Sequence, residues 1–427
     1  MGHLGDLLQG ARKRAGMTQR QLADLATVSV RAIRDMELGR TKNPHRETIR
    51  LLVDALQMNR ARQIEIETAA GLRPKDHAVD DFWSQIMPPS APLGPIIGRE
   101  QEIATLTGRL ESGSHRMVTV VGVPGVGKTR LNQEIARRIH AKGIIPVLVV
   151  EASTLQRRRS SPDGNWMRDS LTVLLHSAVD CQKAFDQLVS VIGDKQLILV
   201  VNGHTIDAIV PNILLDLLNR CCGLRVLLEA SNINEFADDV VYSLSPLAVQ
   251  DDSYASNDLD SSGYPAIDLL LSRYIWLRAD SVIDSKRRGA IASVCRRLDG
   301  IPGALESAAR WLMFYEPDHL QEIAANSPGQ LTASLNRTDQ DVFYSLSEIF
   351  KSLDQSEMVV IRSLATLHRP WTVDEALSVL RDKSSHAMSE IHRLRVRGLI
   401  RQVASIKSDD RPRFMVLNLI QHICQVL

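Results

Sequence analysis

The chain has 427 residues and a net charge of +1, with 44% hydrophobic and 24% charged residues. This length is more than one hydrophobic core usually serves, and the composition excludes a disordered or fibrous protein. The longest apolar runs, at 144–150 and 197–201, are far shorter than the ~18 residues that a membrane-spanning helix needs. The cysteines are few and unevenly spaced, which indicates neither a disulfide framework nor a zinc site, and we find no secretory signal. We therefore expect a cytoplasmic protein of about three domains that does not act at a membrane.

Positive charge is concentrated near the start of the chain. Residues 1–75 contain 14 lysines and arginines against 8 acidic residues, whereas the remainder is slightly acidic. Such an asymmetry is typical of a small module that faces nucleic acid, joined to a neutral body.

The pattern of apolar residues changes along the chain. The first 70 residues predict short amphipathic helices, and a proline-rich stretch ending in MPPSAPLGP predicts a linker. Beyond it, short β-branched runs alternate with helices, which favours a parallel sheet covered by helices. The predicted strands are 117–121, 146–150, 197–201 and 225–228. Helices alone follow to about residue 336, and two late apolar runs at 398–403 and 413–417 are compatible with a β-wing.

The N-terminal segment contains two short helices joined by a tight turn. Thr18 and Ser29 precede the two helical patterns and are good N-caps. On the second helix Val30, Arg31 and Arg34 are predicted to face outward, and an arginine there can donate two hydrogen bonds to a guanine in the major groove.

This segment resembles the Cro/repressor (XRE) helix-turn-helix family over MTQRQLADLATVSVRAIRDMELGRTKNP. The resemblance implies that the bases of double-stranded DNA are contacted by Ser29, Val30, Arg31 and Arg34. It implies that the DNA backbone is contacted by Gln19, Arg40 and Lys42. Thr27 stands where the family usually has glycine in the turn, which predicts a strained turn. Two simpler readings are a helical bundle with a solvated basic face and a protein-docking module.

The sequence GVPGVGKT follows a predicted strand and precedes a predicted helix. This is the strand–loop–helix context in which G-x-x-x-x-G-K-[ST] forms a phosphate-binding loop, or P-loop. Its glycines let backbone amides converge on a phosphate, and the helix N-terminus adds partial positive charge. We expect Lys128 to reach the β- and γ-phosphates and Thr129 to ligate Mg²⁺.

The sequence around this loop resembles the NB-ARC type of STAND ATPase. The resemblance rests on IIGREQEIATL before the P-loop strand, GIPGAL after it, and HRLRVRGLIRQV near the C-terminus. It implies bound ATP or ADP with Mg²⁺, and self-association when the nucleotide is exchanged. The nucleotide-binding residues that it implies are Ile97, Gly98, Arg99, Gly122, Gly125, Val126, Gly127, Lys128, Thr129, Arg130 and Pro302.

The two resemblances together predict the fold class of a multidomain protein. We expect an all-α helix-turn-helix, then an α/β P-loop nucleotide-binding domain with a parallel sheet, a helical domain and a C-terminal winged helix. The predicted boundaries are 1–75 for the helix-turn-helix, 76–95 for a linker, 96–248 for the P-loop domain, 249–337 for the helical domain and 338–427 for the winged helix.

Three positions depart from the ATPase pattern. The Walker B strand, which should end in an acidic residue, reads LILVVNGHTID, so that Asn202 or Val201 takes that place. Asn232 stands where the family has a sensor arginine, and Leu417 stands at the histidine of its Met-His-Asp motif. Because an amide is a weak Mg²⁺ ligand and no base, we expect nucleotide binding with weak or absent hydrolysis.

The sequence therefore predicts a DNA-binding transcription regulator whose self-association, as a homodimer or larger assembly, is controlled by nucleotide. Two alternatives remain open from these residues. One is a STAND signalling or defence ATPase that uses the N-terminal domain as a targeting handle. The other is a constitutive DNA-binding scaffold that carries a relic ATPase fold.

Overall fold

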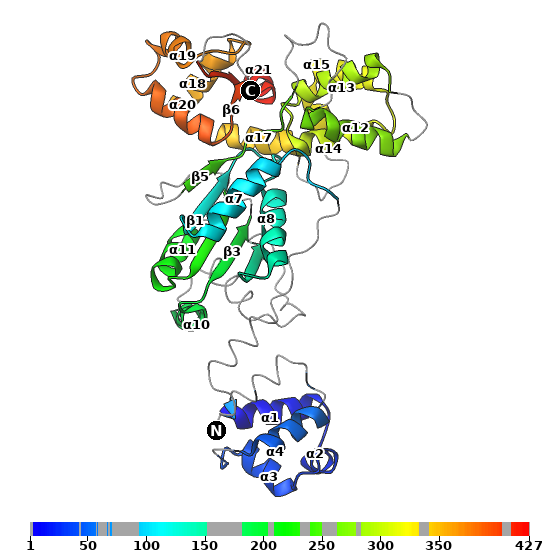
Figure 1. The fold of residues 1–427 in the computed structure, drawn as a ribbon, viewed down its shortest axis with the longest axis vertical. Coiled ribbons are helices and arrows are strands. Elements are labelled where there is room, and N and C mark those ends of the chain that lie inside the picture. The colour runs from blue at the N-terminus through cyan, green and yellow to red at the C-terminus, as the bar shows by residue number, and fades with distance from the viewer. Residues whose placement is uncertain are drawn as a thin grey trace. The chain divides into compact units, whose positions relative to one another are not determined.

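The structure is a computed structural model, shown in Figure 1, which contains an N-terminal helical bundle and a larger body. The two are described separately below. The residues described are 3–41, 44–56, 58, 66, 69–70, 94–151, 182–203, 209–230, 240–249, 263–278, 283–332, 341–403 and 411–426.

The N-terminal bundle is helical, as predicted. Its helices are α1 (His3–Arg14), α2 (Gln19–Ala26), α3 (Val30–Glu37) and α4 (Arg46–Ala55). Apolar side chains at helical spacing point inward, and Leu8, Leu22 and Ile33 are fully buried. Thr18 caps α2 through a capping box, and the Ser29 hydroxyl accepts a hydrogen bond from the third residue of α3. Both predicted N-caps are therefore confirmed.

The turn between α2 and α3 has the strained backbone predicted for it. Thr27 has φ 54° and ψ 35°, in the left-handed region. A side chain branched at Cβ is unfavourable there by about 1–2 kcal/mol. The Thr27 amide bonds the carbonyl of Ala23, so the turn still ends α2 as a glycine would.

The larger body is built on a five-stranded sheet. Its strands are β1 (Met117–Val121), β2 (Val147–Glu151), β3 (Leu197–Asn202), β4 (Leu224–Ala230) and β5 (Val240–Ser243). The order is β2-β3-β4-β1-β5, and every neighbouring pair is parallel. The four predicted strands are confirmed. β5 was not predicted from sequence, because it is a short edge strand whose pairing with β1 is decided by the tertiary fold.

Helices alternate with the strands along the chain. α7 (Glu100–Ser112) precedes β1, and the helices that follow in sequence are α8 (Lys128–Lys142), α10 (Gln182–Ile192) and α11 (Ile209–Arg220). α8 begins at the end of the P-loop and contributes Leu131, Ile135 and Ile139 to the core under the sheet.

The part of residues 263–332 that the structure describes is helical, as predicted. Its helices are α12 (Pro265–Leu277), α13 (Ser285–Arg297), α14 (Pro302–Trp311), α15 (Pro317–Asn326) and α16 (Pro328–Thr332). Proline stands at the start of four of them, where its missing amide hydrogen costs no helical hydrogen bond.

The C-terminal part combines helices with a small hairpin. Its elements are α17 (Val342–Lys351), α18 (Gln355–Ala365), α19 (Val373–Leu380), α20 (Ala387–Val396), β6 (Ile400–Val403), β7 (Arg413–Val416) and α21 (Asn418–Val426). β6 and β7 pair antiparallel, so the two late apolar runs form the predicted two-stranded structure. Trp371, which is fully buried, extends it by backbone hydrogen bonds to Phe414. One continuous apolar core joins these helices to the sheet.

Among the residues that the structure describes, no helix combines the length and apolar character needed to cross a membrane.

Candidate functional site

The P-loop lies between the end of β1 and the start of α8. Gly125 and Gly127 have φ of 74° and 99°, which a side chain would disfavour, and α8 starts directly after them at Lys128. The loop therefore has the backbone that a phosphate cradle requires, with the N-terminus of α8 beneath it.

The lysine of the loop is folded back onto it. Lys128 is 3% exposed, and its Nζ donates to the carbonyl of Gly122 at 2.9 Å and lies 3.4 Å from that of Val123. Burial lowers the pKa of Lys128, while the nearby carboxylate of Glu229 raises it. A phosphate in the loop would offer this ammonium a stronger acceptor than backbone carbonyls.

Thr129, predicted to ligate Mg²⁺, contacts a carboxylate that the sequence analysis missed. Its Oγ1 donates to Oε2 of Glu229 at 2.7 Å. Glu229 lies in β4 and is 1% exposed. The sequence does contain a signal, because one acidic residue interrupts the apolar run LRVLLEA close to its carboxyl end. Ligand sites in parallel sheets gather at that end of the strands.

The predicted Walker B position is engaged elsewhere. Asn202 is fully buried at the end of β3, and its Oδ1 accepts a hydrogen bond from Nδ2 of Asn132 on α8 at 3.2 Å. The side chain of Asn202 therefore helps to hold α8 against the sheet.

A cavity of about 500 Å³ opens over the P-loop. This is within the range of small-molecule sites. Of the predicted nucleotide residues, those that line it are Ile97, Arg99, Gly125, Val126, Gly127, Lys128, Thr129, Arg130 and Pro302. The wall is completed by Glu229, Arg273, Gly303 and Glu306, among others.

Two predicted glycines, Gly98 and Gly122, are absent from that lining and have backbone roles. Gly98 has φ 65°, and a Cβ there would lie 2.3 Å from Pro265 of α12. A Cβ on Gly122 would lie 2.8 Å from the carbonyl oxygen of Leu244. Both glycines therefore permit close packing beside the cavity.

Two arginines hold the entrance segment against the loop. Arg99 is 4% exposed, pairs with Glu102 at 2.9 Å and donates to the carbonyl of Val126 at 3.2 Å. Arg130 bonds the carbonyl of Gly94. These bonds fix residues 94–99 beside the P-loop and close one side of the cavity.

The segment GIPGAL also contacts the P-loop beside the cavity. The amide of Gly303, at the start of α14, donates to the carbonyl of Gly125 in the P-loop at 2.8 Å. A Cβ on Gly303 would lie 2.9 Å from the Cα of Gly125, so the two backbones touch. Pro302 lines the cavity next to this contact.

Leu417, predicted to stand at the histidine position of a Met-His-Asp motif, is fully buried in the core. The next residue, Asn418, bonds Asp299 in the turn before α14. Neither residue is part of the cavity lining.

The predicted base-reading residues share one exposed face of the N-terminal bundle. Ser29, Val30, Arg31 and Arg34 are all exposed. The Arg31 side chain is 93% exposed and lies 3.9 Å from Asp35. A guanidinium placed so openly at the start of a helix can reach a base edge.

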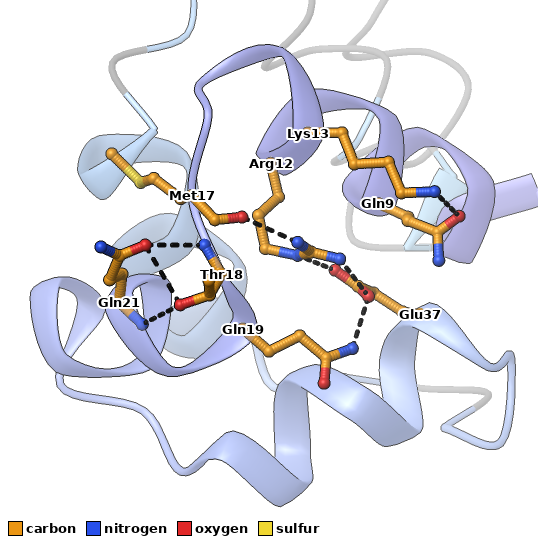
Figure 2. A network of polar contacts seen from close by, with 8 residues as sticks. All are labelled: Gln9, Arg12, Lys13, Met17, Thr18, Gln19, Gln21 and Glu37. Atoms are coloured by element: carbon orange, nitrogen blue, oxygen red, sulfur yellow. Dashed lines mark hydrogen bonds and ion pairs between the residues drawn. The ribbon is translucent and has the colours of Figure 1, made fainter.

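The same bundle contains a buried ion pair between Arg12 and Glu37, shown in Figure 2. Arg12 donates to Glu37 at 2.6 and 3.0 Å, and Gln19 donates to the same carboxylate at 2.7 Å. Gln19, predicted to contact the DNA backbone, uses its amide nitrogen for this bond to Glu37. Arg40, a second predicted backbone contact, is exposed and lies 3.5 Å from Asp35.

Two positions named in the sequence analysis lie outside the described residues, namely Lys42 and Asn232.

Comparison with protein families identifies the N-terminal bundle and the domain that contains the P-loop. A model described as a helix-turn-helix domain matches residues 3–63, and one described as an AAA ATPase domain matches residues 95–222. The chain joins a helix-turn-helix domain to an AAA-type P-loop ATPase domain. The predicted resemblance to XRE regulators and to P-loop ATPases is thereby confirmed. ATPase folds of this type bind nucleotide, usually with Mg²⁺, and helix-turn-helix domains are DNA-binding folds.

Two curated relatives come from Mycobacterium tuberculosis. One uncharacterized protein is 28% identical over 224 residues, which cover 51% of this chain and 50% of that protein. Another, named provisionally as an HTH-type transcriptional regulator, is 24% identical over 301 residues, which cover 63% of this chain and 31% of that protein. The chain thus spans half or less of the length of these relatives.

Among solved structures, Cdc6p from Pyrobaculum aerophilum is similar with a TM-score of 0.35 and 13% identity, over 80% of this chain and 97% of that one. A likeness at this level supports no functional argument.

Proposed function

We propose that this protein is a sequence-specific transcription regulator whose self-association, and with it the affinity for DNA, is set by ATP or ADP in the P-loop cavity. The partners are double-stranded DNA and further copies of the chain, as a homodimer or larger assembly. Hydrolysis is weak or absent, because Asn202 replaces the acidic residue that ends the Walker B strand.

The DNA-binding half of the proposal is supported by the exposed face of α3. A single helix-turn-helix reads few base pairs, so two heads on adjacent half-sites are needed for specific binding. Joining two heads in one assembly raises the effective concentration of the second at its half-site. Control of self-association is therefore sufficient to control DNA affinity.

The nucleotide half is carried by one observation, the contact between Gly303 and Gly125. The P-loop carbonyl that accepts the Gly303 amide belongs to the same loop that would cradle the phosphates. A nucleotide whose phosphates alter this loop, or whose base lies against Pro302, changes the position that α14 prefers. The turn before α14 also bonds the N-terminus of α21 through Asp299. The cavity is thus linked to the C-terminal helices by two direct contacts.

We also propose the functional boundaries given above, including an NB-ARC arrangement for residues 96–427. The helices α12–α16 and the hairpin β6–β7 with its helices support a helical domain followed by a winged helix. In this arrangement Ile97 and Arg99 lie by the adenine and Lys128 binds the β- and γ-phosphates. Thr129 ligates Mg²⁺.

The first experiment tests nucleotide control. The purified chain is denatured, and released nucleotide is quantified by ion-exchange chromatography beside Lys128→Ala. DNA fragments selected by the wild-type protein are then titrated by fluorescence anisotropy with ATP, with ADP and without nucleotide. The proposal predicts that affinity and assembly size depend on nucleotide in the wild type and not in Lys128→Ala. Lys142→Ala is the matched control, since Lys142 lies on the same helix and pairs with Glu111 on the surface.

The second experiment tests the DNA-reading face. Arg31→Ala should weaken specific binding by about 1–3 kcal/mol. Arg50→Ala, which removes another exposed arginine of the bundle from α4, should not. Unchanged specificity in Arg31→Ala would remove the proposed role of α3. Measurable ATP turnover without specific DNA binding would favour the signalling ATPase instead. An unchanged DNA affinity in Lys128→Ala would favour the constitutive scaffold.

A further inference from the structure

The carboxylate of Glu229 occupies an unusual place in the sheet. In the β1–β4 pairing Glu229 lies beside Val120, and in the β3–β4 pairing the preceding residue, Leu228, lies beside Val201. Glu229 is therefore level with Asn202, one strand nearer to the P-loop strand β1. The acidic residue that is missing at the end of β3 has a counterpart at the same height on β4.

The contacts of Glu229 are those of a group that works with the P-loop. Its Oε2 accepts the hydroxyl of Thr129 at 2.7 Å, and its charge acts on the ammonium of Lys128. All three residues line the cavity. Asn202, by contrast, is engaged with Asn132 of α8.

We propose that Glu229, together with Thr129, holds the Mg²⁺ that accompanies a bound nucleotide, in place of the missing acidic residue of β3. This rests on the proposed binding of nucleotide in the cavity. The pair fits the metal, because Mg²⁺ prefers carboxylate and hydroxyl oxygens and usually keeps several waters that such a carboxylate can orient.

The charges in the cavity lead to the same conclusion. The ammonium of Lys128 interacts with Glu229, and it would turn to the phosphates when a nucleotide binds. A buried carboxylate would then face phosphate oxygens, and like charges close to one another repel strongly where water is scarce. A divalent cation between them removes this repulsion. Glu229 should therefore make nucleotide binding depend on Mg²⁺ to an unusual degree.

The test is equilibrium binding of a fluorescent N-methylanthraniloyl ADP to the full chain, in excess Mg²⁺ and in EDTA. We expect the wild type to bind at least about tenfold more tightly with Mg²⁺. In Glu229→Gln, which keeps the hydrogen bond from Thr129 but removes the charge, the difference should fall to about twofold or less. The affinity in EDTA should rise above that of the wild type, because the repulsion is gone.

Glu134→Gln is the matched control. Glu134 is also a buried glutamate, but it lies on α8 and pairs with Arg137 and Arg138 outside the cavity. Its Mg²⁺ dependence should equal that of the wild type. Thermal melting shows whether each variant is folded. If Glu229→Gln does not fold, Glu229→Asp keeps the charge but withdraws it by one methylene, and should lower the affinity with Mg²⁺ while leaving the affinity in EDTA unchanged.

The outcomes separate this inference from the proposed function. A wild type that binds the probe equally well with and without Mg²⁺ overturns the role of Glu229 alone. A Glu229→Gln protein with the Mg²⁺ dependence of the wild type does the same. A wild type that binds no nucleotide under either condition overturns nucleotide control as well.

Discussion

Asp299 and Asn418 are 119 residues apart in the chain, and Oδ1 of Asp299 lies 2.9 Å from both the backbone nitrogen and Nδ2 of Asn418. The other carboxylate oxygen accepts the amide of Leu419 at 3.0 Å. Asp299 thus caps the N-terminus of α21 from the turn between α13 and α14. It is fully buried, and Arg401 lies 3.9 Å from it.

This cap should make the stability of the larger body depend on pH. Burial raises the pKa of the Asp299 carboxyl to about 6, although Arg401 and the amides of Asn418 and Leu419 lower it. In the unfolded chain an aspartate has a pKa of about 3.9. Between these values the folded chain binds more protons, so the contribution of Asp299 to stability is fully present below pH ~4 and is lost as the pH rises through about 6.

We predict that Asp299→Asn removes this part of the pH dependence, because an amide does not titrate. Urea unfolding followed by tryptophan fluorescence, in which the buried Trp371 takes part, should show a difference between wild type and variant that changes between pH 4 and 6 and is constant from pH 7 to 8. Parallel curves over the whole range would contradict the prediction. Asp299→Ala should instead destabilise at every pH, by about 1–3 kcal/mol for each buried amide left without an acceptor.

The turn of the helix-turn-helix domain offers a stabilising change. Thr27→Gly should lower the strain at φ 54° and stabilise the bundle by about 1 kcal/mol, less than the full strain because glycine also adds freedom to the unfolded chain. Hydrogen exchange of the α2 and α3 amides in the full chain measures this change in the stability of the bundle. Gly16→Ala is the reverse case, since Gly16 has φ 68° and an added Cβ would have nothing within 4 Å, so that only backbone strain opposes it. Gly16→Ala should destabilise the bundle, and slower hydrogen exchange in that variant would contradict the role assigned to the left-handed backbone.

The ion pair between Arg12 and Glu37 should stabilise the bundle only while Glu37 is charged. Burial raises the pKa of Glu37, but the hydrogen bonds from Arg12 and Gln19 outweigh it, so the pKa lies below its ordinary value. This contribution is present above the unfolded pKa of about 4.3 and is lost as the pH falls through the lower folded value.

We predict that Glu37→Ala destabilises the bundle by about 3–5 kcal/mol, because the buried charge of Arg12 would lose its carboxylate partner. The double variant Arg12→Met/Glu37→Leu should recover much of this loss by replacing the pair with apolar groups of similar size. Hydrogen exchange of α1 and α3 reports both. A Glu37→Ala bundle as stable as the wild type would show that the pair contributes nothing.

The contact between α14 and the P-loop should govern how long a nucleotide stays bound. In Gly303→Ala the added Cβ meets the backbone of Gly125, which cannot move aside as a flexible side chain could. We expect α14 to shift away from the loop and the nucleotide to leave about tenfold faster, a change of about 1.4 kcal/mol. A stopped-flow chase of the fluorescent ADP measures the rate. Gly289→Ala, in α13 with nothing within 4 Å of the added Cβ, is the control and should leave the rate unchanged.

The sequence alone determined the features that depend on neighbouring residues. The P-loop follows from glycines, lysine and threonine within eight positions. The helix caps at Thr18 and Ser29 follow from one side chain and an amide three residues later. The left-handed turn at Thr27 follows from its place between two helical patterns. These structures are decided by local dihedral preferences and short-range hydrogen bonds, which a local pattern can reveal.

Tertiary structure alone decided which distant groups meet. Thr129 and Glu229 are 100 residues apart, and they meet only because β4 lies directly beside β1 in the sheet. The order of strands depends on the packing of whole helices between them, so no local pattern places a carboxylate of β4 at the P-loop. The sequence therefore predicted a phosphate cradle without its acidic partner, and the parallel sheet brought one to it from the neighbouring strand.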